Sequence, residues 1–170
     1  RVSDLAPFVD RARRTVTSTT GELKLDYGTG VLVVDAPAAQ GASGRLRETG
    51  AIETRDLRIA SGMELGHVVA VSLDERPLRT TRRILLQVMS EEKPTGFRTA
   101  PLAHGARRIL ALGRDPWLVR RLEGTVQLER PDADRMTVTA LDPNGYPIAA
   151  VGSAASITLA PTTTYYLITR

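Results

Sequence analysis

The chain has 170 residues, of which 42% are hydrophobic and 25% are charged, so it resembles an ordinary globular protein with enough length to bury a core. It has no apolar run near the roughly 18 residues of a membrane span. The absence of cysteine excludes disulfides, thiol catalysis and thiolate metal sites. The formal net charge is +4, but acidic and basic residues are interspersed and no arginine cluster alternates with aromatic residues. We therefore expect neither a nucleic acid nor a membrane as partner.

Residues 1–14 differ in pattern from the remainder. Ser3 or Asp4 is placed to cap a short helix that carries Leu5 and Phe8 on one apolar face. Because the chain does not begin with Met, we expect a fragment or a processed chain, with this segment as a linker or as the tail of a preceding domain. An exposed apolar patch at Leu5 and Phe8 would then be covered by that domain.

A hairpin is predicted within the stretch from Thr17 to Leu46, and we expect the later strands to be arranged around it. Apolar and charged residues alternate from Leu23 to Tyr27, a Gly-Thr-Gly turn follows, and Val31 to Val34 is an apolar run. We expect the second strand to be covered on both faces. The segment from Ala38 to Gly50, rich in Ala, Gly and Ser, is expected to be a long surface connection.

The middle of the chain continues the strand pattern. Leu57 and Ile59 alternate with polar residues, and a further strand is expected over His67 to Leu73, followed by a polar turn. Ile84 to Met89 is nearly all apolar and predicts a central strand covered on both faces. The segment from Glu91 to Gly105 contains two prolines and two glycines, so we expect the longest loop there, where binding residues tend to lie.

Short strands recur through the last third, each bounded by turn residues. They are expected over Arg108 to Leu112, Leu118 to Leu122, Thr125 to Glu129, Met136 to Leu141, Ser156 to Leu159 and Tyr165 to Ile168. The strongest turn signal, Asp-Pro-Asn-Gly, begins at Asp142. About ten to twelve strands with turns every 8 to 12 residues predict an all-β domain over residues 15–170. We expect a two-sheet antiparallel β-sandwich of the jelly-roll or Greek-key type, with the short N-terminal helix before it.

Catalytic motifs are not evident. His67 and His104 have no metal-ligand spacing, and no phosphate loop, nucleophile elbow or dinucleotide fingerprint is present. Glycoside hydrolysis needs two carboxyl groups a few ångströms apart. Candidate carboxylates are Glu22 with Asp26, Asp35, and Glu91 with Glu92, which strand surfaces and loops also produce by chance. Asp132 and Asp134 near a turn are weak candidates for Ca²⁺, with a turn role favoured, and no other cofactor is indicated.

Sugar binding would need exposed aromatic rings to stack on pyranoses. Aromatic residues make up only 4% of the chain. Trp117, at the entry to a strand, is either exposed or closes the end of the core, and we favour the second. The candidate carbohydrate-binding residues are Trp117, Phe97, Tyr146 and Tyr27.

The opening segment carries a resemblance. TSTTGELKLDYGTGVLVVDAPAAQGASG, beginning at Thr17, resembles a segment of large secreted bacterial glycoside-hydrolase-like proteins, in which a Gly-Glu-Leu strand leads through Asp-Tyr-Gly-x-Gly to an Asp-x-Pro-x-x-Gln-Gly-Ala segment. The matching positions include Glu22, Asp26, Tyr27 and Gln40. Later stretches, among them ALDPNGYP and TTYYLITR, are similar in kind.

The resemblance implies a secreted C-terminal β-sandwich accessory domain, beside an upstream catalytic barrel that acts on polysaccharide. It assigns no catalytic residue to this region. We therefore expect a non-catalytic domain that packs on the catalytic domain and contacts polysaccharide. The alternatives are a purely structural or interaction module and a free-standing carbohydrate-active enzyme. Two carboxylates within about 10 Å in a cleft would favour the enzyme.

Overall fold

The structure, a computed structural model, describes residues 4–170 and is built almost entirely of antiparallel strands. Its helical segments are 3-10 turns of three residues each: η1 (Ala6–Phe8), η2 (Leu46–Glu48), η3 (Ala103–Gly105) and η4 (Ala133–Arg135). The predicted all-β class is confirmed. Within the described residues, no helix has the length and apolar character to cross a membrane.

Two sheets form the body of the molecule. The larger has ten strands, in the spatial order β1 (Val9–Asp10), β2 (Thr15–Thr17), β3 (Leu23–Asp26), β4 (Val31–Ala36), β5 (Ala39–Gly44), β8 (Gly66–Ser72), β9 (Arg83–Ser90), β18 (Tyr165–Thr169), β15 (Thr137–Leu141) and β16 (Pro147–Ser153). The smaller has four, in the order β17 (Ile157–Thr158), β14 (Thr125–Leu128), β7 (Leu57–Ala60) and β6 (Ala51–Glu53). The chain passes between the sheets several times.

One hydrophobic core joins the two sheets. Val68, Leu86 and Tyr166 of the larger sheet and Ile59 and Val126 of the smaller sheet are almost completely buried and belong to the same cluster. Burial of apolar surface contributes roughly 25 cal/mol per Å², so this shared core is the main source of stability. Tyr166 hydroxyl accepts a hydrogen bond from the Ala160 N–H at 2.7 Å, which satisfies the polar end of a buried ring.

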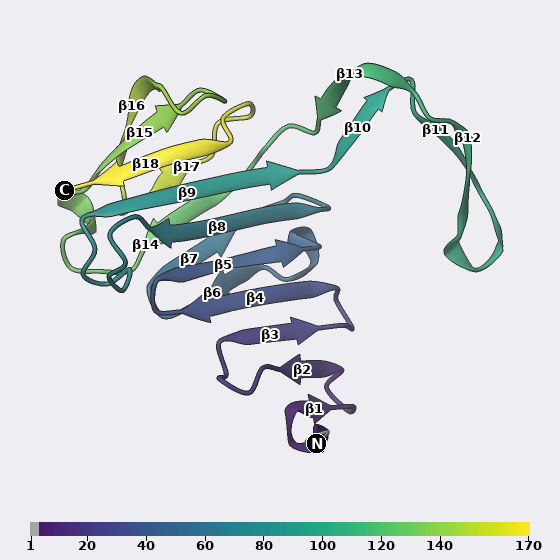
Figure 1. The fold of residues 1–170 in the computed structure, drawn as a ribbon, viewed down its shortest axis with the longest axis horizontal. Helices are drawn as coiled ribbons and strands as arrows, with labels where there is room; N and C mark the ends of the chain where they lie inside the picture. Colours follow the sequence, from purple (N-terminus) through teal and green to yellow (C-terminus); the bar gives the residue numbers. More distant parts are fainter. Residues whose placement is uncertain (1–3) are drawn as a thin grey trace.

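The predicted opening hairpin exists, but it is not the centre of the fold. β3 pairs with β4 in the register Leu23 with Val34 and Asp26 with Val31. Leu23 and Leu25 are exposed, and Val31 is the only buried residue of β4. The core lies instead under β5, β8, β9, β18 and β15. The expected burial of β4 on both faces is therefore wrong, because the hairpin lies toward the β1 edge of the sheet (Figure 1).

The segment from Ala38 to Gly50 is not a surface connection. It contains β5, which lies between β4 and β8, and the turn η2 with the buried Leu46. Packing requires a glycine at position 41. A Cβ on Gly41 would lie 2.2 Å from the carbonyl oxygen of Val68 on β8. The Ala-, Gly- and Ser-rich composition, which is typical of a loop, therefore occurs here in the closely packed strand β5.

The N-terminal segment forms less helix than expected. Ser3, one of the two predicted caps, lies outside the described residues. Asp4 Oδ1 accepts a hydrogen bond from the Ala6 N–H at 2.9 Å, but only the single turn η1 follows. The chain then continues as β1, which pairs with β2 at the sheet edge. Leu5 is 57% exposed and Phe8 is half-buried. The boundary of the predicted β domain at residue 15 stays a prediction.

β9 has the predicted central position, between β8 and β18, but only one covered face. Ile84, Leu86 and Val88 are buried, whereas Gln87 on the opposite face is exposed. Five of the strands predicted in the last third are present with small shifts in their ends. The sixth, expected over Leu118 to Leu122, lies instead at β13 (Arg114–Val119), and β16 was not predicted. The Asp142 turn is confirmed between β15 and β16, because its Oδ1 accepts hydrogen bonds from two following backbone N–H groups.

The expected loop after β9 is an arm that reaches away from the body (Figure 1). We define the arm as residues 91–121. It consists of β10 (Glu92–Thr95) paired with β13 (Arg114–Val119) and, farther out, β11 (Arg98–Pro101) paired with β12 (Arg107–Ala111). At its base the Arg120 N–H donates to the Glu91 carbonyl at 2.9 Å, and the Ser90 hydroxyl donates to the Arg120 carbonyl. No residue of the arm is buried.

Candidate interaction site on the arm

The arm concentrates both charge and exposed apolar surface. It contains seven Lys and Arg residues against three acidic ones, which equals the net charge of +4 of the whole chain, so the remaining 16 basic and 16 acidic residues cancel. Its large exposed hydrophobic residues are Leu102, Ile109, Leu110, Leu112, Trp117, Leu118 and Val119. An exposed apolar surface of this kind is a candidate interaction site.

Two predicted aromatic residues meet in a groove on the arm. Trp117 lies directly across the β10–β13 ribbon from Pro94, and cross-strand neighbours share one face of a ribbon. With Phe97 they line the aromatic groove, of about 690 Å³, whose other walls are Glu92, Lys93, Leu112, Gly113, Arg114 and Asp115. Trp117 is 58% exposed, so the expectation that it anchors the core is wrong. No core extends into the arm for it to fill.

Gly113 lets the two ribbons of the arm join beside Trp117. It has a φ of +79°, and a Cβ there would lie 2.8 Å from the Thr95 carbonyl oxygen. The Thr95 hydroxyl donates to the Pro116 carbonyl at 2.6 Å, which ties the end of β10 to β13. This local geometry keeps Phe97 and Trp117 at one groove.

The other two predicted aromatic residues lie elsewhere. Tyr146 follows the turn before β16 and is 69% exposed. Tyr27 lies in the turn between β3 and β4, where the Arg14 guanidinium is 5.7 Å from its ring centroid. Neither residue lines the aromatic groove. The structure therefore brings together Trp117 and Phe97 and separates them from the other pair.

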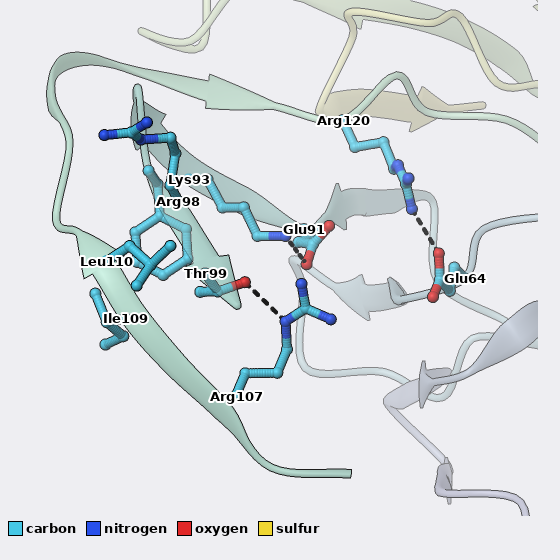
Figure 2. Close-up of a pocket in the computed structure, with 10 residues that line it drawn as sticks. Glu64, Glu91, Lys93, Arg98, Thr99, Arg107, Ile109, Leu110 and Arg120 are labelled. Carbon is cyan, nitrogen blue, oxygen red and sulfur yellow. Dashed lines mark hydrogen bonds and ion pairs between the residues drawn. The ribbon is translucent and has the colours of Figure 1, made fainter. Parts of the chain in front are cut away.

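A second concavity lies where the arm faces the body, and Figure 2 shows its side chains. We call it the hollow. Its volume is about 910 Å³, and it is lined by Glu64, Glu91, Lys93, Phe97, Arg98, Thr99, Arg107, Ile109, Leu110 and Arg120. Glu64, in the loop before β8, is the contribution of the body.

Ion pairs organise the base of the hollow. Arg120 Nη1 lies 2.8 Å from Glu64 Oε2, and Lys93 Nζ lies 2.6 Å from Glu91 Oε1 (Figure 2). Hydrogen bonding and charge from Arg120 hold the pKa of Glu64 below its usual value. The Arg107 Nε–H donates to the Thr99 hydroxyl at 2.7 Å. Both acidic side chains of the hollow thus have cationic partners.

Glu64, one of the two carboxylates of the hollow, lacks the raised pKa of a catalytic acid. A glycosidase needs one carboxyl group that stays protonated as an acid, usually because its pKa is raised. Glu64 has the opposite perturbation. Of the other candidate carboxylates, Asp26 accepts hydrogen bonds from the Gly28 and Thr29 N–H groups, chiefly that of Thr29, which lowers its pKa. Asp35 pairs with Arg55 at 3.6 Å.

Of the two predicted calcium ligands, Asp132 forms ion pairs with arginines and Asp134 is exposed. Asp132 Oδ1 lies 2.6 Å from Arg130 Nε, and Oδ2 lies 2.8 Å from Arg170 Nη1. Asp134 is exposed in η4. Among residues 4–170, no group of three or more His, Asp or Glu side chains could hold a metal ion. His67 Nδ1 forms a hydrogen bond with the Ser43 hydroxyl at 2.6 Å.

The sequence interpretation missed the cationic residues of the hollow, Arg98 and Arg107. A signal for them was present, because no acidic residue occurs between Lys93 and Arg114. Comparisons with protein-family models, with curated proteins and with solved structures gave no match to this chain.

Proposed function

We propose that this chain is a non-catalytic accessory domain of a secreted glycoside hydrolase, which packs on the catalytic domain through its arm and contacts polysaccharide with the aromatic groove. The observation that carries the proposal is the arm itself. Trp117 and Phe97 meet there on a surface that no part of the described chain buries. The proposals that the parent enzyme is a glycoside hydrolase and that it is secreted rest on the resemblance of the opening segment.

The groove has features suited to a sugar. The exposed indole of Trp117 offers a flat apolar face, which can stack on the C–H face of a pyranose ring. Glu92 and Asp115 line the same groove and offer acceptors for sugar hydroxyl groups, and Arg114 offers donors. Open grooves with a few polar groups around aromatic faces are typical binding sites.

The proposal includes a finer fold type. A shared core between a ten-stranded and a four-stranded antiparallel sheet, with several crossings between them, supports a β-sandwich with jelly-roll or Greek-key connections. The body with its shared core would then hold the arm in place, and the arm would make the contacts.

Affinity electrophoresis on plant and algal polysaccharides tests the sugar contact. We expect retention on at least one polysaccharide, and we expect Trp117→Ala to reduce the affinity about tenfold or more, because a stacked ring contributes roughly 1–2 kcal/mol. Phe97→Ala should weaken the same interaction. Tyr146→Ala is the matched control, since it removes an exposed aromatic ring outside the groove.

Absence of retention on every polysaccharide would contradict the sugar contact. The chain would then fit the second candidate, a purely structural or interaction module, which the exposed aliphatic residues of the arm favour. Equal losses from Trp117→Ala and Tyr146→Ala would contradict a contact specific to the groove.

A further inference from the structure

The hollow has a charge pattern that a sugar contact at the aromatic groove does not explain. Its acidic residues, Glu64 and Glu91, are paired with Arg120 and Lys93. Arg98 and Arg107 have no carboxylate within ion-pair distance anywhere in residues 4–170. We propose that the hollow binds an extended acidic protein segment that carries apolar side chains. This inference rests on the packing half of the proposed function and does not use the polysaccharide half.

The unpaired guanidinium groups determine the charge of the partner. Arg98 lies on β11 and Arg107 on β12, so both strands of the outer ribbon contribute one cation to the hollow. Arginine presents several donors in a fixed planar fork that matches a carboxylate. A segment with two or more Asp or Glu residues would supply the missing countercharges.

The apolar lining indicates a protein rather than a sugar. Besides Phe97, which it shares with the aromatic groove, the hollow is lined by Ile109 and Leu110, which are more than half exposed. Leu118 extends the same kind of surface along the arm. Aliphatic side chains offer no flat face for a pyranose, but they pack well against apolar residues of another chain. Covering them would remove exposed apolar surface from the arm.

The open edges of the arm indicate an extended partner. In the described part of the chain, β11 and β12 pair only with each other, so the outer edge of each strand is free. A two-stranded ribbon is at best marginally stable in water, and a third strand supplies the missing pairing. Addition of a strand to such an edge is a common mode of peptide recognition.

Charge argues against a second copy as the occupant. The arm carries the whole net charge of +4, and the body has a formal charge of zero. Contact between two arms would bring like charges together, and the body offers no net negative charge to attract an arm.

Fluorescence anisotropy with dye-labelled peptides of about ten residues provides the test, because a strand of that length spans the outer ribbon. The probes alternate Val with Glu, Val with Lys, and Ser with Glu. We expect the Val/Glu peptide to bind the chain most tightly, and its affinity to fall as salt rises from about 50 mM to about 500 mM. The double variant R98E/R107E should weaken this binding about tenfold or more and should favour the Val/Lys peptide.

The control variant R76E/R135E makes the same change of charge at exposed positions on the body and should leave binding unchanged. Thermal unfolding of each variant verifies that the body is folded. Equal binding of the Val/Glu and Val/Lys peptides, binding of none of them, or self-association through the arm in sedimentation velocity would overturn the inference. None of these results depends on polysaccharide retention, so the sugar contact is tested separately.

Discussion

At the scale of single residues, polar side chains inside the body fix the positions of its loops. Gln40 is completely buried, and its Nε2 donates to Asp56 Oδ2 at 2.8 Å. Its Oε1 accepts hydrogen bonds from the Thr54 hydroxyl and from the Asp56 N–H. The other Asp56 oxygen accepts from Arg79 at 3.1 Å. These hydrogen bonds connect β5 to the turn between β6 and β7. Each buried polar atom in the network has a partner, so its burial carries no desolvation penalty from an unpaired group.

Asp74 supports the turn between β8 and β9 and gives a prediction about pH. Its carboxylate accepts hydrogen bonds from the hydroxyls of Thr81 and Ser72 and from the Arg82 N–H, and the Thr81 bond chiefly lowers its pKa below the ordinary value of 3.8. A lowered pKa in the folded state stabilises the protein above the ordinary pKa, and this stabilisation is lost as the pH falls toward the lowered value.

We therefore expect Asp74→Asn to unfold at a lower temperature than the unchanged chain at pH 7. The difference should shrink as the pH falls below about 4, because Asp74 of the unfolded chain, with its ordinary pKa, then binds a proton more readily than Asp74 of the folded chain. Circular dichroism at a series of pH values measures both melting temperatures. Asp134→Asn is the control, because this exposed side chain has no hydrogen-bond partner in the described residues. A difference that stays constant down to pH 2 would contradict the assignment.

At the scale of elements, periodicity and turn chemistry predicted most strands but not their burial. The alternation at β3 and β7 and the Asp142 turn identified these elements, because side-chain period and turn residues are local properties. The prediction from composition was wrong at β5, where Gly41 allows close packing of the strands rather than flexibility. The prediction of a loop from prolines and glycines was also wrong at the arm, where these residues occur in short two-stranded ribbons. Which strands lie under the smaller sheet depends on distant pairing, which no local pattern contains.

Gly41 on β5 provides a direct test of the packing explanation. A Cβ at this position would lie 2.2 Å from the Val68 carbonyl oxygen and 2.7 Å from Val69 Cα, so the backbone of β8 would have to move. We expect Gly41→Ala to lower the free energy of unfolding by about 2 kcal/mol or more, measured by urea denaturation. Gly21→Ala is the control, since φ is +76° there and no atom lies within 4 Å. It should cost only about 1 kcal/mol of backbone strain. Equal costs would contradict the packing explanation.

At the scale of the whole molecule, the body and the arm differ both in burial and in net charge. The body contains every buried residue of the described chain and has a formal charge of zero, whereas the arm contains no buried residue and the entire net charge. The stability of the body and the binding capacity of the arm should therefore be separable. Sequence alone predicted aromatic residues for contact, but it could not show that Trp117 and Phe97 would meet while Tyr27 and Tyr146 would lie apart, because that depends on how the arm folds.

Deletion of the arm tests this division. The Arg120 N–H already donates to the Glu91 carbonyl, so an Asn-Gly turn in place of residues 92–119 can close the chain as a hairpin. We expect the shortened chain to unfold cooperatively with a melting temperature within about 5 °C of the full chain, because none of the deleted residues belongs to the core. It should also lose both polysaccharide retention and binding of the Val/Glu peptide. If the shortened chain fails to fold, the arm is part of the folding unit of the body. If it folds and still binds either ligand, the binding surface lies on the body.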